Sequence, residues 1–238
     1  MYDRIRLFLG KPACVNNINI YSPTIDGIAE IGEVVYNIYI TLASFNKEVI
    51  LKTLFGINDE NYSLIENEDT FDILTSIPAV VHETEKAFSF FTKADVKYDL
   101  TSSSFMAEDV IFVNKHNYLE VSEIIKKLNG MSIDENKPIK FKNEKAKKLH
   151  EKLQQLKKKY QKSDADSLDL KDMLSILCNA DGNGIDVFNV GKLTVYQVYE
   201  HFERLNMKEQ HKRLLKVWAN GYLGSDDKLP EWIIKSKL

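Results

Sequence analysis

The chain has 238 residues, of which 44% are hydrophobic and 11% aromatic, and its formal net charge at pH 7 is −3. A chain of this length can bury one large core or two small ones, so we expect it to fold. The small negative charge excludes a strong attraction of the whole molecule to nucleic acid, and any such affinity therefore requires a local basic patch.

Apolar runs and cysteines indicate where the protein resides. The longest apolar stretches, Val34–Ala43 and Ile73–Val81, are interrupted by polar residues or proline and fall short of the roughly 20 residues of a membrane span. The first apolar run, Leu7–Leu9, is too short for a signal-peptide core. Cys14 and Cys178 are far apart and are expected to be free thiols. These features predict a soluble cytoplasmic protein with no membrane partner.

A β-hairpin followed by a helix is predicted at the N-terminus. Short apolar runs at 4–9 and 15–21 flank Gly10-Lys11-Pro12, which is typical of a small hairpin. Ser22-Pro23 then indicates a helix start, with a capping residue followed by proline at the first helical position. Apolar residues recur at intervals of three and four as far as Phe45, which predicts a core helix.

The middle of the chain is predicted to be mostly helical. Further helices are expected where apolar residues again recur every three or four positions: 47–54, 70–77, 81–91 and 118–128. Gly56 should close the first of these, and Pro78 should separate the second from the third. Residues 58–61 are predicted to be a polar turn. Two β-rich runs, 96–100 and 110–113, predict a second small hairpin.

Composition changes after the polar, proline-containing stretch 132–138. We therefore predict an N-terminal α+β part, residues 1–138, and a C-terminal helical part, residues 139–238, which can share one core. In the second part the pattern predicts four helices: 143–162, 168–177, 194–205 and 208–222, the last two separated by a turn at Asn206. The predicted fold class is mainly α (α+β), a helical protein with one or two small β-hairpins, the first at the N-terminus.

Motifs that carry chemistry are few. Residues 179–186 resemble a calcium-binding loop, but Val190 stands where a bidentate glutamate should complete the coordination shell. The five histidines do not pair with each other, with cysteine or with acids at a ligand spacing. The ten glycines form no phosphate loop, dinucleotide fingerprint or nucleophile elbow. We therefore predict no catalytic residue, no metal site and no cofactor, and a protein that is not an enzyme.

A lysine-rich helix is the main charge feature. Ten lysines lie between Lys140 and Lys162, with only Glu144 and Glu151 as local acids. Such a stripe can hold phosphate groups but lacks the side chains that read base sequence. The possible nucleic-acid patch consists of the lysines expected along this helix: Lys145, Lys148, Lys152 and Lys159. A solvated helix face, or a surface for an acidic protein, is the alternative interpretation.

Aromatic residues gather in the last third of the chain. Three fall at helical spacing and are expected to pack inward: Tyr196, Tyr199 and Phe202. Trp218, Tyr222 and Trp232 instead lie among turn-forming and charged residues, where aromatic anchors in a polar rim are typical of binding surfaces. We predict that these three form a protein interface. The alternative is that both tryptophans pack onto the protein's own core.

Two segments resemble a known family. Residues 22–33, Ser-Pro-Thr-Ile-Asp-Gly-Ile-Ala-Glu-Ile-Gly-Glu, and residues 193–200, Leu-Thr-Val-Tyr-Gln-Val-Tyr-Glu, the latter with Phe202 and Arg204, together resemble tail morphogenesis proteins of tailed bacteriophages from Gram-positive hosts, and among them tail assembly chaperones. The resemblance implies a non-enzymatic protein of the host cytoplasm that binds the tape-measure protein, recruits tail-tube subunits and is absent from or scarce in the finished virion.

The predicted function is therefore a phage tail assembly protein, a chaperone or adaptor whose partners are phage tail proteins or a second copy of itself. The alternative is a phage protein that binds nucleic acid through the lysine-rich helix at 140–162.

Overall fold

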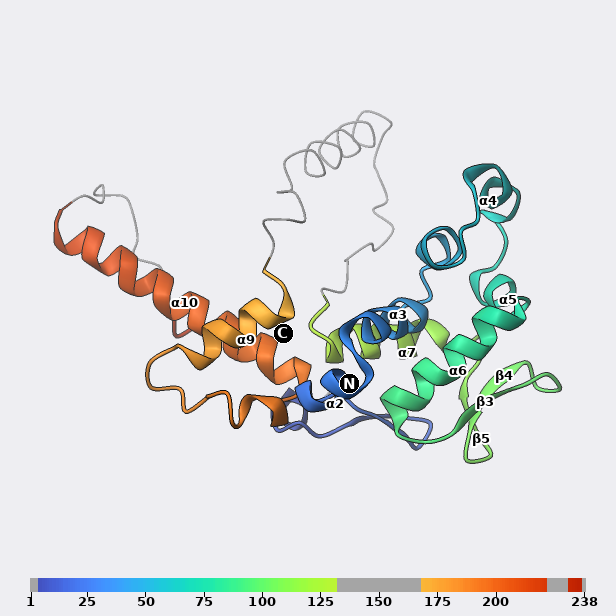
Figure 1. The fold of residues 1–238 in the computed structure, drawn as a ribbon, viewed down its shortest axis with the longest axis horizontal. Helices are drawn as coiled ribbons and strands as arrows, with labels where there is room; N and C mark the ends of the chain where they lie inside the picture. The colour runs from blue at the N-terminus through green and yellow to red at the C-terminus, as the bar shows by residue number, and fades with distance from the viewer. Residues whose placement is uncertain (1–3, 132–167, 222–230, 237–238) are drawn as a thin grey trace.

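The protein is a mainly helical α+β structure with two small antiparallel sheets, which confirms the predicted fold class. Figure 1 shows its computed structural model, which describes residues 4–131, 168–221 and 231–236. One sheet has two strands, in the order β1-β2, and the other has three, in the order β3-β4-β5. Over the described ranges, every helix is too short or too polar to span a bilayer.

The N-terminal hairpin pairs β1 (Ala13–Val15) with β2 (Ile18–Ile20). The predicted strand at 4–9 is wrong, because Arg4–Phe8 forms helix α1. The turn lies at Asn16-Asn17, whose φ angles of 49° and 65° are those of a two-residue hairpin turn that asparagine tolerates. The turn at Asn16-Asn17 sets the pairing of β1 with β2. Both strands therefore lie after residues 10–12, where the turn of the hairpin was predicted.

Two helices replace the single helix predicted up to Phe45. They are α2 (Ile25–Ile31) and α3 (Glu33–Ala43), separated by Gly32 with φ 86°. The cap of α2 is Thr24, whose hydroxyl accepts a hydrogen bond from the backbone N–H of Gly27 at 3.1 Å. The predicted start at Ser22-Pro23 is therefore wrong.

Ser22 and Pro23 instead join the N-terminal region to the segment that opens α10 (Val195–Ala219). The Pro23 carbonyl accepts from the backbone N–H of Val195 at 2.9 Å, and Ser22 Oγ accepts from that of Tyr196 at 3.1 Å. Next to these hydrogen bonds, Thr24 and Thr194 pair in an antiparallel β-bridge. These contacts fix the root of α10 against the beginning of the chain.

After α3 come a π-helix, η1 (Val49–Leu54), and helix α4 (Asp59–Ile65). Gly56 lies between them with φ 68°, as predicted. The predicted polar turn at 58–61 is wrong, because Asn58 caps α4 by accepting from the backbone N–H of Asn61 at 2.9 Å. Two acidic residues follow in the first turn, where the helix dipole favours negative charge.

Lys47 ties the far end of α4 to the body of the protein. Its side chain is buried, and its ammonium donates at 2.7–2.8 Å to three backbone carbonyls: those of Ile65, Glu66 and Glu68. Cationic donors at a helix C-terminus satisfy its last carbonyls and complement its dipole.

The helices α5 (Thr70–Thr75) and α6 (Pro78–Thr92) agree with prediction, and Pro78 stands at the start of α6. The following sheet differs from prediction. Its order places β4 (Ser104–Ala107) between β3 (Val96–Asp99) and β5 (Val110–Val113), so the two predicted strands do not pair with each other. Helix α7 (Tyr118–Leu128) then ends at Asn129-Gly130, as predicted.

The core lies between α3, α6, α7 and the three-stranded sheet, and aromatic rings fill its centre. Phe88 of α6 packs against Phe105 and Phe112 of the sheet, with ring centroids 5.1 and 5.4 Å apart, and Phe45 lies 5.2 Å from Tyr118. The same core includes Val195 and Tyr196 from the predicted C-terminal part. The predicted boundary at 132–138 lies outside the described residues.

In the C-terminal part, α9 (Leu170–Cys178) and the 3₁₀ turn η3 (Val190–Lys192) precede α10. Asp169 caps α9 by accepting from the backbone N–H of Asp172 at 2.7 Å.

Candidate protein-binding surface

Helix α10 is one continuous helix of 25 residues. It begins with a capping box, in which the side chains of Thr194 and Gln197 each accept a hydrogen bond from the other residue's backbone N–H. The predicted turn at Asn206 is wrong, because asparagine costs only a fraction of a kcal/mol in a helix and neither glycine nor proline follows it before α10 ends at Ala219. At the far end, Gly221 takes the left-handed conformation with φ 72°.

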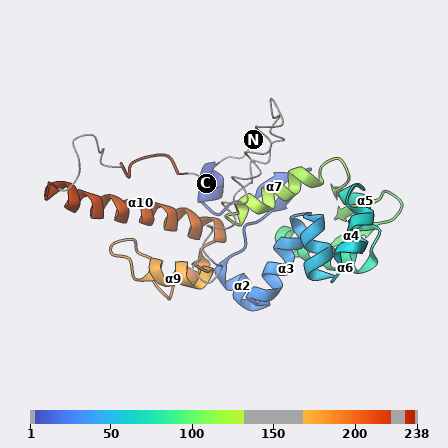
Figure 2. The same ribbon diagram turned by 90° about the horizontal axis from the view of Figure 1, so that it is seen from above.

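The burial of α10 is confined to its root. Its buried residues all lie in the first six positions: Val195, Tyr196, Val198 and Glu200. Beyond them the helix continues for roughly 30 Å at 1.5 Å per residue, away from α6 and the three-stranded sheet (Figures 1 and 2). We call residues 206–219 the projecting half of α10.

The projecting half is amphipathic. Apolar side chains recur three and four positions apart and share one face: Met207, Leu214, Leu215 and Trp218. Trp218 is 58% exposed and Leu215 42% exposed, so this face is not covered by the core. An exposed apolar stripe on a helix is typical of a surface that binds another macromolecule.

Basic residues border this apolar face. The projecting half carries four cationic side chains against one acid, Glu209: Lys208, Lys212, Arg213 and Lys216. Glu209 is paired with Lys212 at 2.6 Å, and this contact lowers the pKa of the Glu209 carboxyl. The surface is therefore suited to a partner that offers apolar contacts surrounded by negative charge.

Of the three predicted interface residues, the structure describes Trp218 and Trp232, and it places them at different points along the length of α10. Trp218 lies near its end. Trp232, which is 37% exposed, belongs to the C-terminal segment at 231–236 and lines a hollow of about 150 Å³ with Leu205 and Lys208 in the middle of the helix. Tyr222 lies outside the described residues. The two tryptophans are thus roughly 15 Å apart along the helix axis, and only Trp218 belongs to the projecting half.

Polar contacts hold the C-terminal segment against α1 and α10. Arg204 donates to the carbonyl of Ile234, and Arg4 donates to Ser236 Oγ at 2.8 Å. Beside them, Glu200 is buried, with its Oε1 3.8 Å from Nε of Arg204. Among the described residues, Oε2 of Glu200 is a buried oxygen without a hydrogen-bond partner.

The inward-facing aromatic residues predicted on α10 agree in part with the structure. Tyr196 is buried, and burial raises its pKa. Tyr199 packs on the core beside Gly130, whereas Phe202 is only partly buried. His201 lies 5.9 Å from the ring of Phe8, and burial lowers the pKa of its imidazole.

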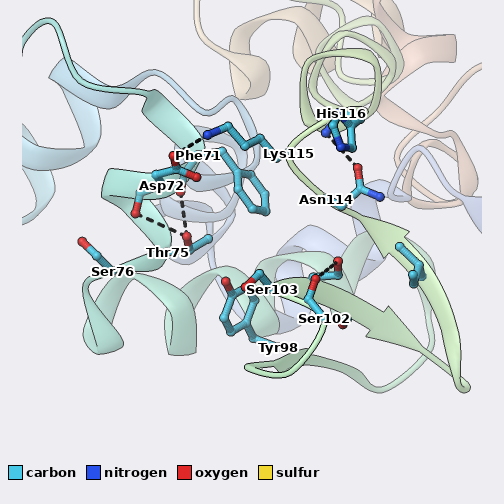
Figure 3. A pocket seen from close by; sticks show the side chains of 12 residues that line it. Phe71, Asp72, Thr75, Ser76, Tyr98, Ser102, Ser103, Asn114, Lys115 and His116 are labelled. Carbon is cyan, nitrogen blue, oxygen red and sulfur yellow. Dashed lines mark hydrogen bonds and ion pairs between the residues drawn. The ribbon is translucent and has the colours of Figure 1, made fainter.

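A second hollow, of about 390 Å³, lies between α5, the β3–β4 turn and the residues before α7 (Figure 3). Lys115 reaches from one side to Asp72 and lies 3.7 Å from Asp69. The hydrogen bond to Asp72 raises the pKa of the lysine. The ion pair between Lys115 and Asp72 therefore connects the two sides of the hollow.

Three hydroxyl groups around this hollow donate hydrogen bonds to backbone carbonyls. Thr75 donates to the carbonyl of Phe71 at 2.8 Å, Ser76 to that of Ile73 at 2.7 Å, and Ser104 to that of Ser102 at 2.9 Å. Such bonds stabilise helix ends and turns, and they do not activate a hydroxyl as a nucleophile. This hollow could not be predicted from the sequence, because its residues are brought together by tertiary packing and share no local motif.

Residues 157–237 match the family model of the YomV second domain. This family is phage-associated, and the match supports a bacteriophage origin for the chain. The matched range contains α9, α10 and the C-terminal segment, whereas the hollow of Figure 3 lies outside it. No curated protein and no solved structure matches the chain.

Within the YomV match, the loop that resembles a calcium site uses its oxygens internally. Asn183 Oδ1 accepts from the backbone N–H of Ile185, and Asp186 Oδ1 accepts from those of Phe188 and Asn189. Gly182 and Gly184 provide the positive φ angles that the turns require. Across the described ranges, no group of three or more potential metal ligands is found.

Two further predictions concern lysine and cysteine. The possible nucleic-acid patch at Lys145, Lys148, Lys152 and Lys159 lies outside the described residues and stays a prediction. Cys14 is exposed and Cys178 is partly buried, and both are free thiols.

Proposed function

We propose that this chain is a non-enzymatic phage assembly protein that binds a protein partner through the projecting half of α10. The observation that carries the proposal is a helix whose apolar face leaves the core after six residues and stays exposed at Trp218. Helical segments of only about 12–15 residues without tertiary packing are marginally stable in water. A partner that covers this face would remove apolar surface from water and stabilise the helix at the same time.

The assembly step that we propose is tail assembly. The support is the resemblance of residues 22–33 and 193–200 to tail morphogenesis proteins, together with the match to a phage-associated family. Both segments lie at the root of α10, where Ser22 and Pro23 bond to Val195 and Tyr196. The proposed partners are accordingly the tape-measure and tail-tube proteins of the same phage, which would bind the exposed half of a helix rooted in these segments.

Capture of phage tail proteins by the purified chain tests the proposal. Trp218→Ala should abolish capture while leaving the melting temperature nearly unchanged, because the side chain is 58% exposed. Phe188→Ala is the matched control, since Phe188 is 91% exposed but lies in the loop before η3. Equal capture by the wild-type protein and both variants would contradict the proposal. Trp232→Ala then measures whether the C-terminal segment contributes.

Nucleic-acid binding is the second candidate function, and the positive charge of the projecting half favours it. Four basic residues there would add to the lysine-rich segment 140–162 in contacting phosphate groups. Copurified nucleic acid would raise the ratio of absorbance at 260 nm to that at 280 nm. Replacing Lys145, Lys148, Lys152 and Lys159 by glutamate should then remove it, and a protein that ignores DNA and RNA at low salt would eliminate this candidate.

A further inference from the structure

The end of the molecule opposite to α10 is acidic. Residues 58–72, which we call the acidic end, contain six acids and no basic residue: Asp59, Glu60, Glu66, Glu68, Asp69 and Asp72. All six are exposed. Lys52 pairs with Asp59 at 2.7 Å, and Lys115 pairs with Asp72, so an excess of negative charge stays on this surface. Leu64 of α4 projects from it with 78% of its surface exposed.

The acidic end and the projecting half of α10 are complementary in chemistry. One offers exposed carboxylates around Leu64, and the other offers basic residues around Trp218 and Leu215. Opposite charges around apolar contacts steer association and select the orientation of the partners.

Both views of the molecule place these two surfaces at its opposite ends (Figures 1 and 2). Helix α10 points away from α4, and its root is fixed by backbone hydrogen bonds to Ser22 and Pro23. The two surfaces therefore cannot meet within one molecule. They can meet only between molecules.

We propose that the projecting half of α10 docks onto the acidic end of a second copy of this chain. This inference rests on the proposed function, since it uses the same helix face, and it names the chain itself as a partner. The contact is heterologous, because two different surfaces meet, and a pair of copies keeps one free acidic end and one free projecting half. Such contacts generate rings when the rotation closes and open helical filaments when it does not.

A symmetric contact is disfavoured by the same charges. Two projecting halves would bring Arg213 and Lys216 of each copy near those of the other, and two acidic ends would oppose carboxylates. Like charges facing each other across an interface are repulsive. Head-to-tail contact is the arrangement that places unlike charges together, and its strength should fall with added salt.

Sedimentation of the purified full chain over a range of protein and salt concentrations tests the inference. We expect species larger than a monomer at low salt and dissociation at high salt. The pair Arg213→Glu and Lys216→Glu should weaken association by about tenfold or more, and so should the pair Glu66→Lys and Glu68→Lys. These four residues are exposed, and their replacement leaves the pairs Lys52–Asp59, Lys115–Asp72 and Glu209–Lys212 intact.

Combining the two pairs of reversals provides the decisive comparison. A chain that carries all four substitutions has the charges at positions 213 and 216 exchanged with those at positions 66 and 68, so its self-association should be stronger than that of the chain with Arg213→Glu and Lys216→Glu alone. Circular dichroism and the melting temperature verify that every variant is folded. A chain that sediments as a monomer throughout, or whose association ignores the reversals, overturns the inference. If Trp218→Ala still abolishes capture of tail proteins in that case, the proposed function stands without it.

Discussion

Helices α6 and α10 differ in what keeps them helical. The 15 residues of α6 include buried side chains from its first turn to its last: Val80, Thr84, Ala87, Phe88, Phe91 and Thr92. The 25 residues of α10 include buried side chains only at the root. Tertiary packing supports α6, whereas a capping box and local ion pairs support much of α10. The core and the proposed binding surface are thus separated along the chain, and substitutions in each should have different consequences.

The largest contrast is expected between Phe88→Ala and Trp218→Ala. Phe88 is fully buried and touches three other rings, so its removal leaves a cavity and should lower the free energy of unfolding by about 3–5 kcal/mol. Trp218→Ala should change it by less than about 0.5 kcal/mol, because the ring is exposed. Chemical denaturation measures both, and a large loss in the second variant would place Trp218 in the core.

The next effect tests how firmly the root of α10 is held. A Cβ at Gly130 would lie 2.1 Å from the ring of Tyr199, and Gly130 has φ 68°. Gly130→Ala should therefore destabilise the fold by about 2–4 kcal/mol through crowding and backbone strain. Gly182→Ala is the matched control, since its φ is 75° but nothing lies within 4 Å, and it should cost only about 1–2 kcal/mol. Equal losses would show that the contact with Tyr199 is unimportant.

A smaller effect should come from Lys47→Met, which removes three hydrogen bonds to the carbonyls at the end of α4 but keeps a long apolar stem. We expect a loss of about 1–3 kcal/mol and faster hydrogen exchange in α4. Lys97→Met serves as the control, because Lys97 is exposed and pairs only at 3.3 Å with Asp95. If hydrogen exchange in α4 is unchanged in Lys47→Met, the N-terminal cap at Asn58 is sufficient to hold the helix.

The smallest effect concerns pH. Burial lowers the pKa of His201, so the unfolded chain takes up a proton on this residue before the folded protein does. Stability should therefore decrease as the pH falls from about 7 through the unfolded value of about 6.5, and this contribution is complete once the pH is below the folded pKa. His201→Gln should reduce the slope of stability against pH in this window. An identical slope in the variant would show that His201 does not cause this pH dependence of stability.

Local signals were sufficient where several of them agreed. Pro78 at the start of α6 and Asn129-Gly130 at the end of α7 each coincide with a change in apolar spacing, and both boundaries were predicted correctly. The prediction failed where the same local sequence pattern is compatible with two different structures. The polar residues at 58–61 suit a turn as well as the capped first turn of α4. The serines at 102–104 suit a loop, and strand β4, which begins at Ser104, was therefore not predicted.

The candidate surface was harder to predict than the fold. Apolar residues at intervals of three and four mark a helix face, but they do not tell whether the core still lies beside it. Tyr196 and Trp218 both follow this spacing on one helix, yet the first is buried and the second is exposed. The difference depends on where the helix leaves the core, which is a tertiary property.

Mechanically, α10 is a cantilever. Its first six residues are clamped where Thr194 bridges to Thr24 and Tyr199 lies over Gly130, contacts with α9 and the C-terminal segment reach as far as Lys208, and the helix projects beyond them. A load applied at Trp218 acts through that lever on a short clamp that joins residues far apart in the chain. A partner that pulls on the tip would therefore load the contacts of Arg204 and Lys208 with the C-terminal segment first, and the joint between the N-terminal segment and α7, roughly 30 Å away, after them.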